Sequence, residues 1–281
     1  MNIEHAGVAL QINVDGPADG PPILFLHGIG SCAQTYDFLV DELPAHRLHR
    51  VDFRGHGASG RTPGQYALGD YVQDAVGVLE QSIGGRAVVV GHSLGGLTAT
   101  LLAQRRPDLV TAVFLEDPPL FFGDPATYAA TSFPVVFSLI KAAIDSWQES
   151  GTSAADIAAA VGTTPSMSGQ GALGDEITPD GLAAFGAAFA TVDTGVYDTT
   201  GESLRELDPQ APIPVPGIVL HGERALSGAL FEEHAALIAS INPHIEVIGM
   251  SGVGHLIHDS RSHRVRYSEQ LHRFLDRYAP A

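Results

Sequence analysis

Cysteine, positive charge and long apolar runs are all scarce in this sequence of 281 residues. Cys32 is the only cysteine, which excludes an intramolecular disulfide and a metal site built from several thiolates. No apolar run reaches the roughly 18 residues that a membrane-spanning helix needs. The best candidate, residues 133–144, is short and contains Lys141. We therefore predict no membrane-spanning segment.

The charge balance also narrows the expected partners. Lys and Arg together number 15 against 32 Asp and Glu, which gives a formal net charge of −17. Such a surface repels phosphate backbones and anionic lipid, so we expect no nucleic acid and no membrane as a partner. The first five residues lack the basic and apolar regions of a signal peptide. The expectation is a cytoplasmic protein with a small-molecule substrate; its oligomeric state stays open, with a homodimer as one option.

Apolar segments alternate with helical ones along the first 118 residues. Hydrophobic residues make up 44% of the chain and charged ones 17%, as in globular proteins. Strands are predicted at residues 8–14, 23–26, 49–53, 87–90 and 110–115, and helices at 36–43, 71–83 and 97–104. This alternation is typical of an α/β fold with a mostly parallel sheet that helices cover on both faces.

The pattern changes between residues 119 and 212, which are rich in Ala, Gly, Thr and Ser. Helices are predicted at 133–148, 154–161 and 180–189, and no strand. Strands resume at 217–220 and 245–249, and an amphipathic helix at 268–278 closes the chain. We predict a core domain of residues 1–118 and 213–281, with residues 119–212 inserted as a helical cap. The alternative is that these helices only pack against the core.

The run Gly91-His92-Ser93-Leu94-Gly95 directly follows the apolar segment 87–90. It matches the G-x-S-x-G pattern, in which a strand enters a sharp turn, exposes a serine hydroxyl and continues as a helix, here from near Gly96. The glycines are needed because the turn leaves no room for side chains. Although an ordinary strand-to-helix turn is the alternative, the position favours Ser93 as a nucleophile.

A serine needs a base, which in this chain order is expected near the C-terminus. His255 fits, since it follows the last predicted strand in the glycine-containing segment 252–255. His258 and Asp259 lie close by and could form part of a metal site with His255. No further ligand cluster is evident in the sequence, so a supporting or loop role for His258 is the preferred interpretation.

The oxyanion of the tetrahedral intermediate needs two positioned N–H donors. One is expected to be the backbone N–H of Leu94, the residue after the nucleophile. The other is expected from the loop after the strand at 23–26, as the N–H of Ile29.

These motifs together resemble the α/β-hydrolase-fold serine hydrolases. The resemblance rests on His27-Gly28, on residues 52–57, on Gly91 to Gly96 and on Gly254-His255, in that order along the chain. It implies a mostly parallel sheet, acyl-enzyme chemistry and no cofactor or metal. Dehalogenases and epoxide hydrolases of this fold carry an Asp at the elbow, so Ser93 argues against both.

The acid of the triad departs from the family pattern. Most members carry it shortly after the strand that follows the cap, where this chain has Ala225, with Glu223 two positions earlier. Some lactone hydrolases and haloalkane dehalogenases instead take it from the end of the strand before the cap, where this chain has Glu116-Asp117. Asp117 is the preferred acid, with Glu116 and Glu223 as alternatives. The non-catalytic alternative is that Asp117 is an ordinary turn residue before Pro118.

The sequence thus predicts a serine hydrolase that cleaves a small, fairly apolar carboxylic ester or lactone by a Ser93-His255-Asp117 triad. Hydrolysis of a C–C bond needs the same serine and histidine and is the alternative among enzymes. The alternative from another functional class is a ligand-binding or receptor protein of this fold with little turnover. The only feature that favours it is that the acid is absent from its usual place after the strand that follows the cap.

Overall fold

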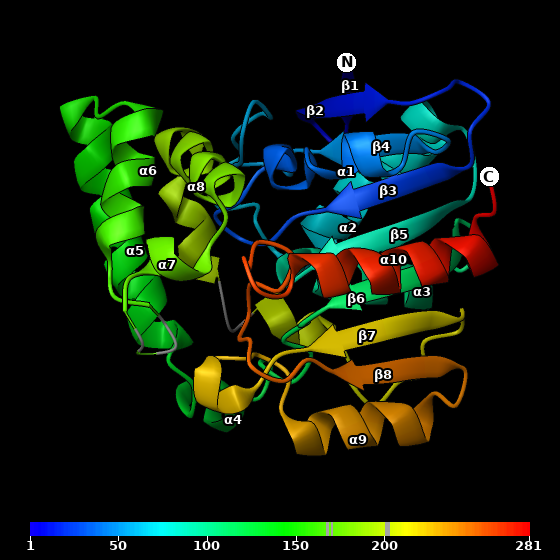
Figure 1. The fold of residues 1–281 in the computed structure, drawn as a ribbon. Helices are drawn as coiled ribbons and strands as arrows, with labels where there is room; N and C mark the ends of the chain where they lie inside the picture. Colours follow the sequence, from blue (N-terminus) through cyan, green and yellow to red (C-terminus); the bar gives the residue numbers. More distant parts are fainter. Residues whose placement is uncertain (167–168, 170, 200–202) are drawn as a thin grey trace.

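The computed structural model describes residues 1–166, 169, 171–199 and 203–281. Its centre is an eight-stranded sheet with the order β1-β2-β4-β3-β5-β6-β7-β8 (Figure 1). β1 and β2 are antiparallel to their neighbours, and the remaining strands are parallel. The strands are β1 (Asn2–His5), β2 (Val8–Asp15), β3 (Pro22–Leu26), β4 (Arg47–Val51), β5 (Ala87–His92), β6 (Val110–Glu116), β7 (Gly217–His221) and β8 (Ile245–Gly249).

Helices cover both faces of the sheet. The α-helices are α1 (Leu39–Glu42), α2 (Leu68–Gly77), α3 (Leu94–Arg105), α4 (Pro125–Ala129), α5 (Phe133–Ser150), α6 (Ala154–Thr163), α7 (Leu173–Glu176), α8 (Pro179–Thr191), α9 (Glu232–Ile241) and α10 (Arg264–Tyr278). Short helical turns of other types are η1 (Ala33–Tyr36), η2 (Val78–Ile83), η3 (Thr194–Thr199), η4 (Ser203–Glu206) and η5 (Arg224–Leu226).

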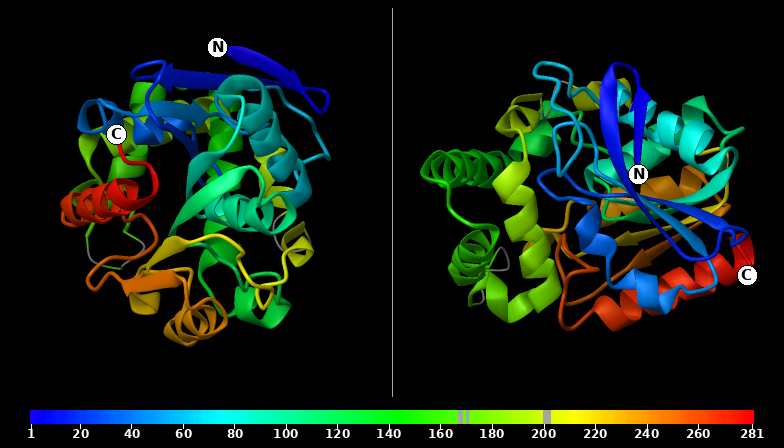
Figure 2. Two further views of the ribbon diagram at one scale, coloured as in Figure 1. Left: turned by 90° about the vertical axis from the view of Figure 1, so that its right-hand side faces the viewer. Right: turned by 90° about the horizontal axis from the view of Figure 1, so that it is seen from above.

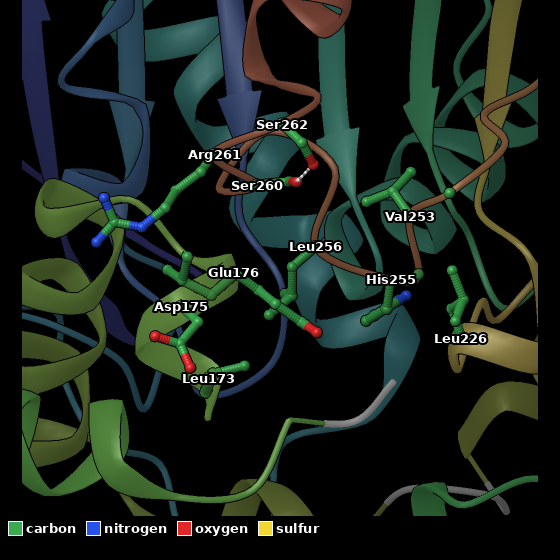
Figure 3. Close-up of a pocket in the computed structure, with 13 residues that line it drawn as sticks. Leu173, Asp175, Glu176, Leu226, Val253, His255, Leu256, Ser260, Arg261 and Ser262 are labelled. Atoms are coloured by element: carbon green, nitrogen blue, oxygen red, sulfur yellow. Dashed lines mark hydrogen bonds between the residues drawn. The ribbon is translucent and has the colours of Figure 1, made fainter. Parts of the chain in front are cut away.

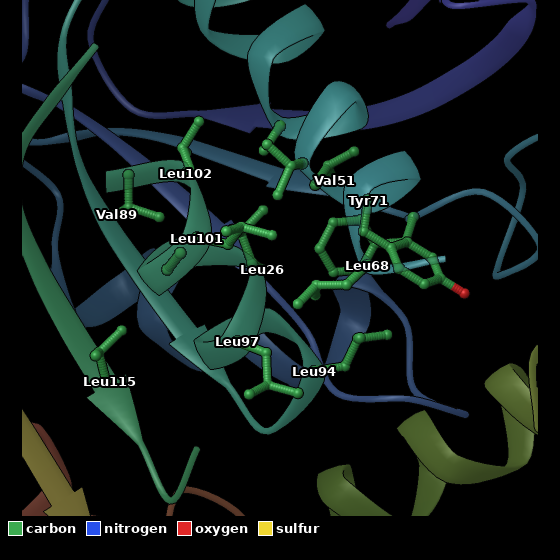
Figure 4. Close-up of a cluster of buried hydrophobic side chains, with 14 of the residues drawn as sticks. Leu26, Val51, Leu68, Tyr71, Val89, Leu94, Leu97, Leu101, Leu102 and Leu115 are labelled. Carbon is green, nitrogen blue, oxygen red and sulfur yellow. The ribbon is translucent and has the colours of Figure 1, made fainter. Parts of the chain in front are cut away.

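The central strands are apolar on both sides because each side faces a helix layer. All six residues of β5 are buried, as expected for a parallel strand between two layers. One apolar cluster joins this sheet to α2 and α3 through residues such as Leu97 and Leu101 (Figure 4). A second cluster joins the opposite face to α1 and α10. Figure 2 shows the ribbon from two further sides, with α10 in red along that face. This double cover confirms the predicted α/β class.

The differences from the sequence prediction include β1 and the segment 36–43. β1 was not predicted, because its four residues are too few for a periodic signal. The single helix predicted at 36–43 is wrong, since η1 ends at Tyr36 and α1 begins at Leu39. Between them Asp37 and Phe38 keep helical backbone angles, but the N–H groups of Asp37 and Val40 bond to carbonyls three residues back instead of four, so the α-helix is interrupted.

The segment between β6 and β7 is helical, and its helices α5 to α8 lie beyond the carboxyl ends of the parallel strands (Figure 1). Ligand sites of open α/β sheets form at this edge. Thr178, just before α8, donates its backbone N–H to the carbonyl of Asp259 at 2.9 Å, which ties this segment to the loop after β8. No helix among the described residues is both long and apolar enough to cross a bilayer.

Candidate active site

Ser93 is the residue at which β5 turns into α3. Its backbone has φ 52° and ψ −114°, a conformation that residues with a side chain rarely adopt and that recurs at functional sites. A Cβ on Gly91 would lie 2.3 Å from the Gly95 carbonyl oxygen, and a Cβ on Gly95 would lie 1.9 Å from that of Leu26. The strand–turn–helix predicted around Ser93 is therefore present, although α3 begins at Leu94 and not near Gly96.

Replacing Gly95 tests how much the elbow depends on this close packing. We expect Gly95→Ala to lower the free energy of unfolding by about 3 kcal/mol, because the added Cβ overlaps backbone that cannot move away. The measurement is urea denaturation at equilibrium. Gly85→Ala is the matched control, since a Cβ there meets nothing within 4 Å and should leave stability nearly unchanged. Equal stability of the two variants would contradict the prediction.

His255 and Asp117 meet across the ends of β8 and β6. The Nδ1 atom of His255 lies 2.7 Å from Oδ2 of Asp117, and both side chains are buried. Three backbone N–H groups hold the carboxylate of Asp117, donated by Gly222 at 3.2 Å, Ala229 at 2.7 Å and Leu230 at 3.3 Å. Asp117 is thus fixed on the side of the imidazole that leaves Nε2 available to another group.

The two alternative acids have other partners. Glu116 is the last residue of β6, and its carboxylate lies 2.7 Å from Nδ1 of His258. Asp117 follows the strand with φ 40°, so the two adjacent acids do not share one regular strand geometry. Glu223 accepts hydrogen bonds from the Ser251 hydroxyl and the Gly252 N–H. Of the three carboxylates, only Asp117 contacts His255 among the described residues.

Leu94 directly follows Ser93 in the chain, and Ile29 lines the same pocket as Ser93. Leu94 is the first residue of α3, so its N–H has no acceptor within the helix. Ile29 follows Gly28, where an added Cβ would lie 3.3 Å from Cβ of Ser93. Within the described ranges, neither N–H donates to another residue. Both predicted oxyanion donors are therefore near Ser93 and unoccupied by protein acceptors.

Two buried histidines hold the loop that carries Ile29. His56 accepts a hydrogen bond from the Gly30 N–H at 3.1 Å, and His27 accepts one from the Phe53 N–H at 3.1 Å. Burial lowers the pKa of His27 to about 4 and that of His56 to about 3. Because both rings are neutral near pH 7, they can accept these bonds, which explains the histidines in two of the motifs.

Ser93 and His255 line the same pocket. In the described part of the chain the Ser93 hydroxyl makes no hydrogen bond, so the structure places nucleophile and base together without joining them. The contact between nucleophile and base is often long in unliganded enzymes and tightens with substrate. The ring of Phe133, from α5, lies 5.0 Å from the ring of His255.

The pocket above Ser93 is largely apolar and has a volume of about 500 Å³. Its floor includes Gly28, Ile29 and Ser93 from the core. The segment between β6 and β7 contributes most of its apolar lining: Phe133, Val136, Phe137, Leu139, Ile140, Trp147, Val161, Leu173, Phe185 and Phe189. A concave apolar site with a few converging polar groups is the usual form of a small-ligand site.

Glu116 and His258 form a second acid–histidine pair beside Asp117 and His255. Glu116 also accepts the backbone N–H of His258 at 2.8 Å, and its carbonyl accepts the Ser93 N–H at 3.0 Å. The other ring nitrogen of His258 lies 2.8 Å from the Thr35 hydroxyl. The sequence analysis considered both residues separately and missed their pairing. The sequence feature that could have revealed this pairing is the presence of two adjacent acids, Glu116 and Asp117, and of two histidines three residues apart, His255 and His258.

The charges of this second pair stabilise each other. Burial alone would lower the pKa of His258, but the carboxylates of Asp259 and Glu116 outweigh burial and raise the pKa to about 9. Burial alone would raise the pKa of Glu116, but its charged neighbour His258 lowers that pKa to about 2. His258 is therefore an imidazolium at neutral pH with both ring nitrogens engaged by Glu116 and Thr35. The described residues include no cluster of three or more side chains suited to a metal ion.

Part of this chain is similar in sequence to known hydrolases. The 2-(acetamidomethylene)succinate hydrolase of Mesorhizobium japonicum is 36% identical over 109 residues, which are 38% of this chain and 39% of that protein. An esterase of Mycobacterium tuberculosis is 42% identical over 114 residues, which are 40% of this chain and 37% of that protein. The matches thus span less than half the length of these relatives.

Similarity of structure extends over nearly the whole chain. The enol-lactonase of Burkholderia xenovorans LB400 superposes with a TM-score of 0.72 at 20% identity, covering 98% of this chain and 99% of that one. At this identity the likeness establishes the fold alone. The sequence model of the alpha/beta hydrolase family matches residues 23–266. This chain therefore belongs to the alpha/beta hydrolase family.

Proposed function

We propose that the protein is a serine hydrolase that cleaves a small, fairly apolar carboxylic ester or lactone through an acyl-enzyme. The observation that carries this proposal is the 2.7 Å contact between His255 and Asp117, in the same pocket as a serine on a strained elbow. This arrangement has the three parts that acyl transfer needs: a nucleophile, an oriented base and N–H donors.

In the proposed reaction Ser93 Oγ attacks the carbonyl carbon while Nε2 of His255 takes the hydroxyl proton. The N–H groups of Ile29 and Leu94 bind the oxyanion of the tetrahedral intermediate. His255 then delivers the proton to the leaving oxygen, and the acyl group stays on Ser93. Water, with His255 again as the base, releases the acid and restores the serine. Asp117 keeps the imidazole in the tautomer that this cycle requires.

The apolar lining supports the choice of substrate. Burial of apolar surface contributes roughly 25 cal/mol per Å², and the aromatic and aliphatic side chains of residues 119–212 provide that surface above Ser93. We assign this segment as a cap that determines which acyl group fits. No cofactor or metal takes part in the proposed chemistry.

The two alternatives are less well supported. Hydrolysis of a C–C bond would use the same Ser93 and His255, and no observation on this chain favours it over ester hydrolysis. The case for a binding protein with little turnover depended on a displaced acid. Because Asp117 reaches His255 from the end of β6, that argument loses its basis.

Labelling by a fluorophosphonate tests whether Ser93 is activated, without a guess about the substrate. We expect one label per chain, located on the Ser93 peptide by mass spectrometry, with fluoride as the leaving group. Ser93→Ala should abolish the label, and His255→Ala should reduce its rate by at least about 100-fold. Ser31→Ala is the control, because this serine lines the same pocket and should not matter. Folded wild-type protein that stays unlabelled would disprove the mechanism.

A further inference from the structure

A second cavity adjoins the first beside the proposed catalytic base. It has a volume of about 340 Å³ and lies between α7 and the loop that carries His255 (Figure 3). His255, Leu256 and Leu173 line both cavities, whereas Ser93 lines only the first. In Figure 3 the side chains of Leu256 and Leu173 face one another at this common boundary.

The proposed reaction requires the two halves of the substrate to lie in different places. The acyl carbon must contact Ser93 and the oxyanion donors, which belong to the first cavity. The leaving oxygen must instead lie next to His255, because the same imidazole delivers its proton. A leaving group that extends from that oxygen along His255 passes the two leucines and enters the second cavity.

The two cavities also differ in chemistry. The first is lined mainly by aromatic and aliphatic side chains, including Trp147. The second contains the carboxylates of Asp175 and Glu176 and the hydrogen-bonded hydroxyls of Ser260 and Ser262.

The formal charge of the second cavity is negative. Among the lining residues that the structure describes, Asp175 and Glu176 are acidic and Arg261 is basic. The Nε and Nη2 atoms of this arginine donate to the Gly174 carbonyl at 3.3 and 3.2 Å, and its guanidinium points away from Leu256 in Figure 3. Like charges in a partly desolvated cavity repel, so this site disfavours an anion.

We propose that the second cavity binds the leaving group of the substrate, a small polar alcohol without negative charge, while the first binds the apolar acyl group. This inference rests on the proposed ester hydrolysis and adds the polarity of each half of the substrate. It also predicts that specificity for the two halves can be changed separately.

The experiment compares ratios of kcat/KM within two substrate series, followed by acid release in a pH-stat. In the acyl series, methyl butyrate is compared with methyl octanoate. In the leaving-group series, methyl butyrate is compared with the butyrate monoester of glycerol and with the butyryl ester of glycolate, which is anionic. Ratios are used because a change in the amount of folded protein cancels in them.

Leu226 and Trp147 are matched positions, since each lines only one of the cavities. We expect Leu226→Trp to lower kcat/KM for the glycerol ester about tenfold relative to methyl butyrate, and to leave the acyl ratio unchanged. Trp147→Ala should change the acyl ratio about tenfold and leave the leaving-group ratio unchanged. Leu226→Phe is the smaller substitute if Leu226→Trp does not fold.

The negative charge of the second cavity can be tested independently of its size. Glu176→Gln removes one carboxylate and should raise kcat/KM for the glycolate ester several-fold relative to the glycerol ester. An active enzyme whose leaving-group ratios are unmoved by changes at Leu226 and Glu176, or whose acyl ratio moves with Leu226, would overturn the leaving-group assignment alone. Absence of both fluorophosphonate labelling and hydrolysis of any ester would instead overturn the proposed function, and this inference with it.

Discussion

Asp117→Asn is expected to lower kcat by about 10⁴-fold, with a much smaller effect on KM. The carboxylate of Asp117 accepts the Nδ1–H of His255 at 2.7 Å and stabilises the imidazolium that forms during attack. An amide at this position can present its NH₂ group to the ring and favour the wrong tautomer. The measurement is the steady-state hydrolysis of 4-nitrophenyl butyrate, with folding checked by circular dichroism.

Glu223→Gln is the matched control for Asp117→Asn, because Glu223 is the alternative acid that the sequence analysis considered after β7. Its carboxylate binds Ser251 and Gly252 and not His255, so kcat should stay within about threefold of the wild type. A large loss in Glu223→Gln together with a retained rate in Asp117→Asn would move the acid to Glu223. It would also require the loop around His255 to rearrange when substrate binds.

Glu116→Gln is expected to lower the free energy of unfolding by about 3 kcal/mol at pH 7. The substitution leaves the buried imidazolium of His258 with Asp259, whose carboxylate lies 3.4 Å away, as its remaining acidic partner. Removal of one member of a buried ion pair is costly because the other charge stays desolvated. Urea denaturation measures the loss, and Glu223→Gln again serves as the control.

The pH dependence of stability distinguishes this pair from ordinary packing. The folded-state pKa of His258 is raised from 6.5 to about 9, so its contribution is fully present below pH 6.5 and is lost as pH rises through 9. The shift corresponds to roughly 3 kcal/mol. Wild-type protein should therefore lose stability between pH 6.5 and 9, and Glu116→Gln should show a much flatter profile. Parallel profiles for the two proteins would refute this explanation.

The sequence predicted well those elements whose period and length are unambiguous. β8 has the predicted bounds, and α5 extends the predicted helix by two residues. It failed where periodicity does not distinguish one helix type from another. Apolar residues at Tyr36, Leu39 and Leu43 have helical spacing, yet the N–H groups of Asp37 and Val40 bond three residues back, so the segment divides into η1 and α1.

Some residues of the candidate site could likewise be recognised from local sequence, and others could not. Ser93, Leu94 and Ile29 could be identified from sequence because each belongs to a local turn whose glycines have a steric purpose. For the acid, the sequence favoured Asp117 but left Glu116 and Glu223 open, since all three lie at or shortly after the ends of β6 and β7. Glu116, at the end of β6, contacts His258, and Asp117, which follows it with φ 40°, contacts His255. Both contacts depend on where the loop after β8 passes, which local pattern does not report.

The sequence by itself determined the fold class and the elbow, because hydrophobic periodicity and glycine sterics act over a few neighbouring residues. Only the tertiary structure decided which carboxylate meets which histidine and how the segment between β6 and β7 lines the pocket. It also decided that a second cavity borders His255. These features join residues far apart in the chain, and their contacts depend on the packing of whole elements and not on local pattern.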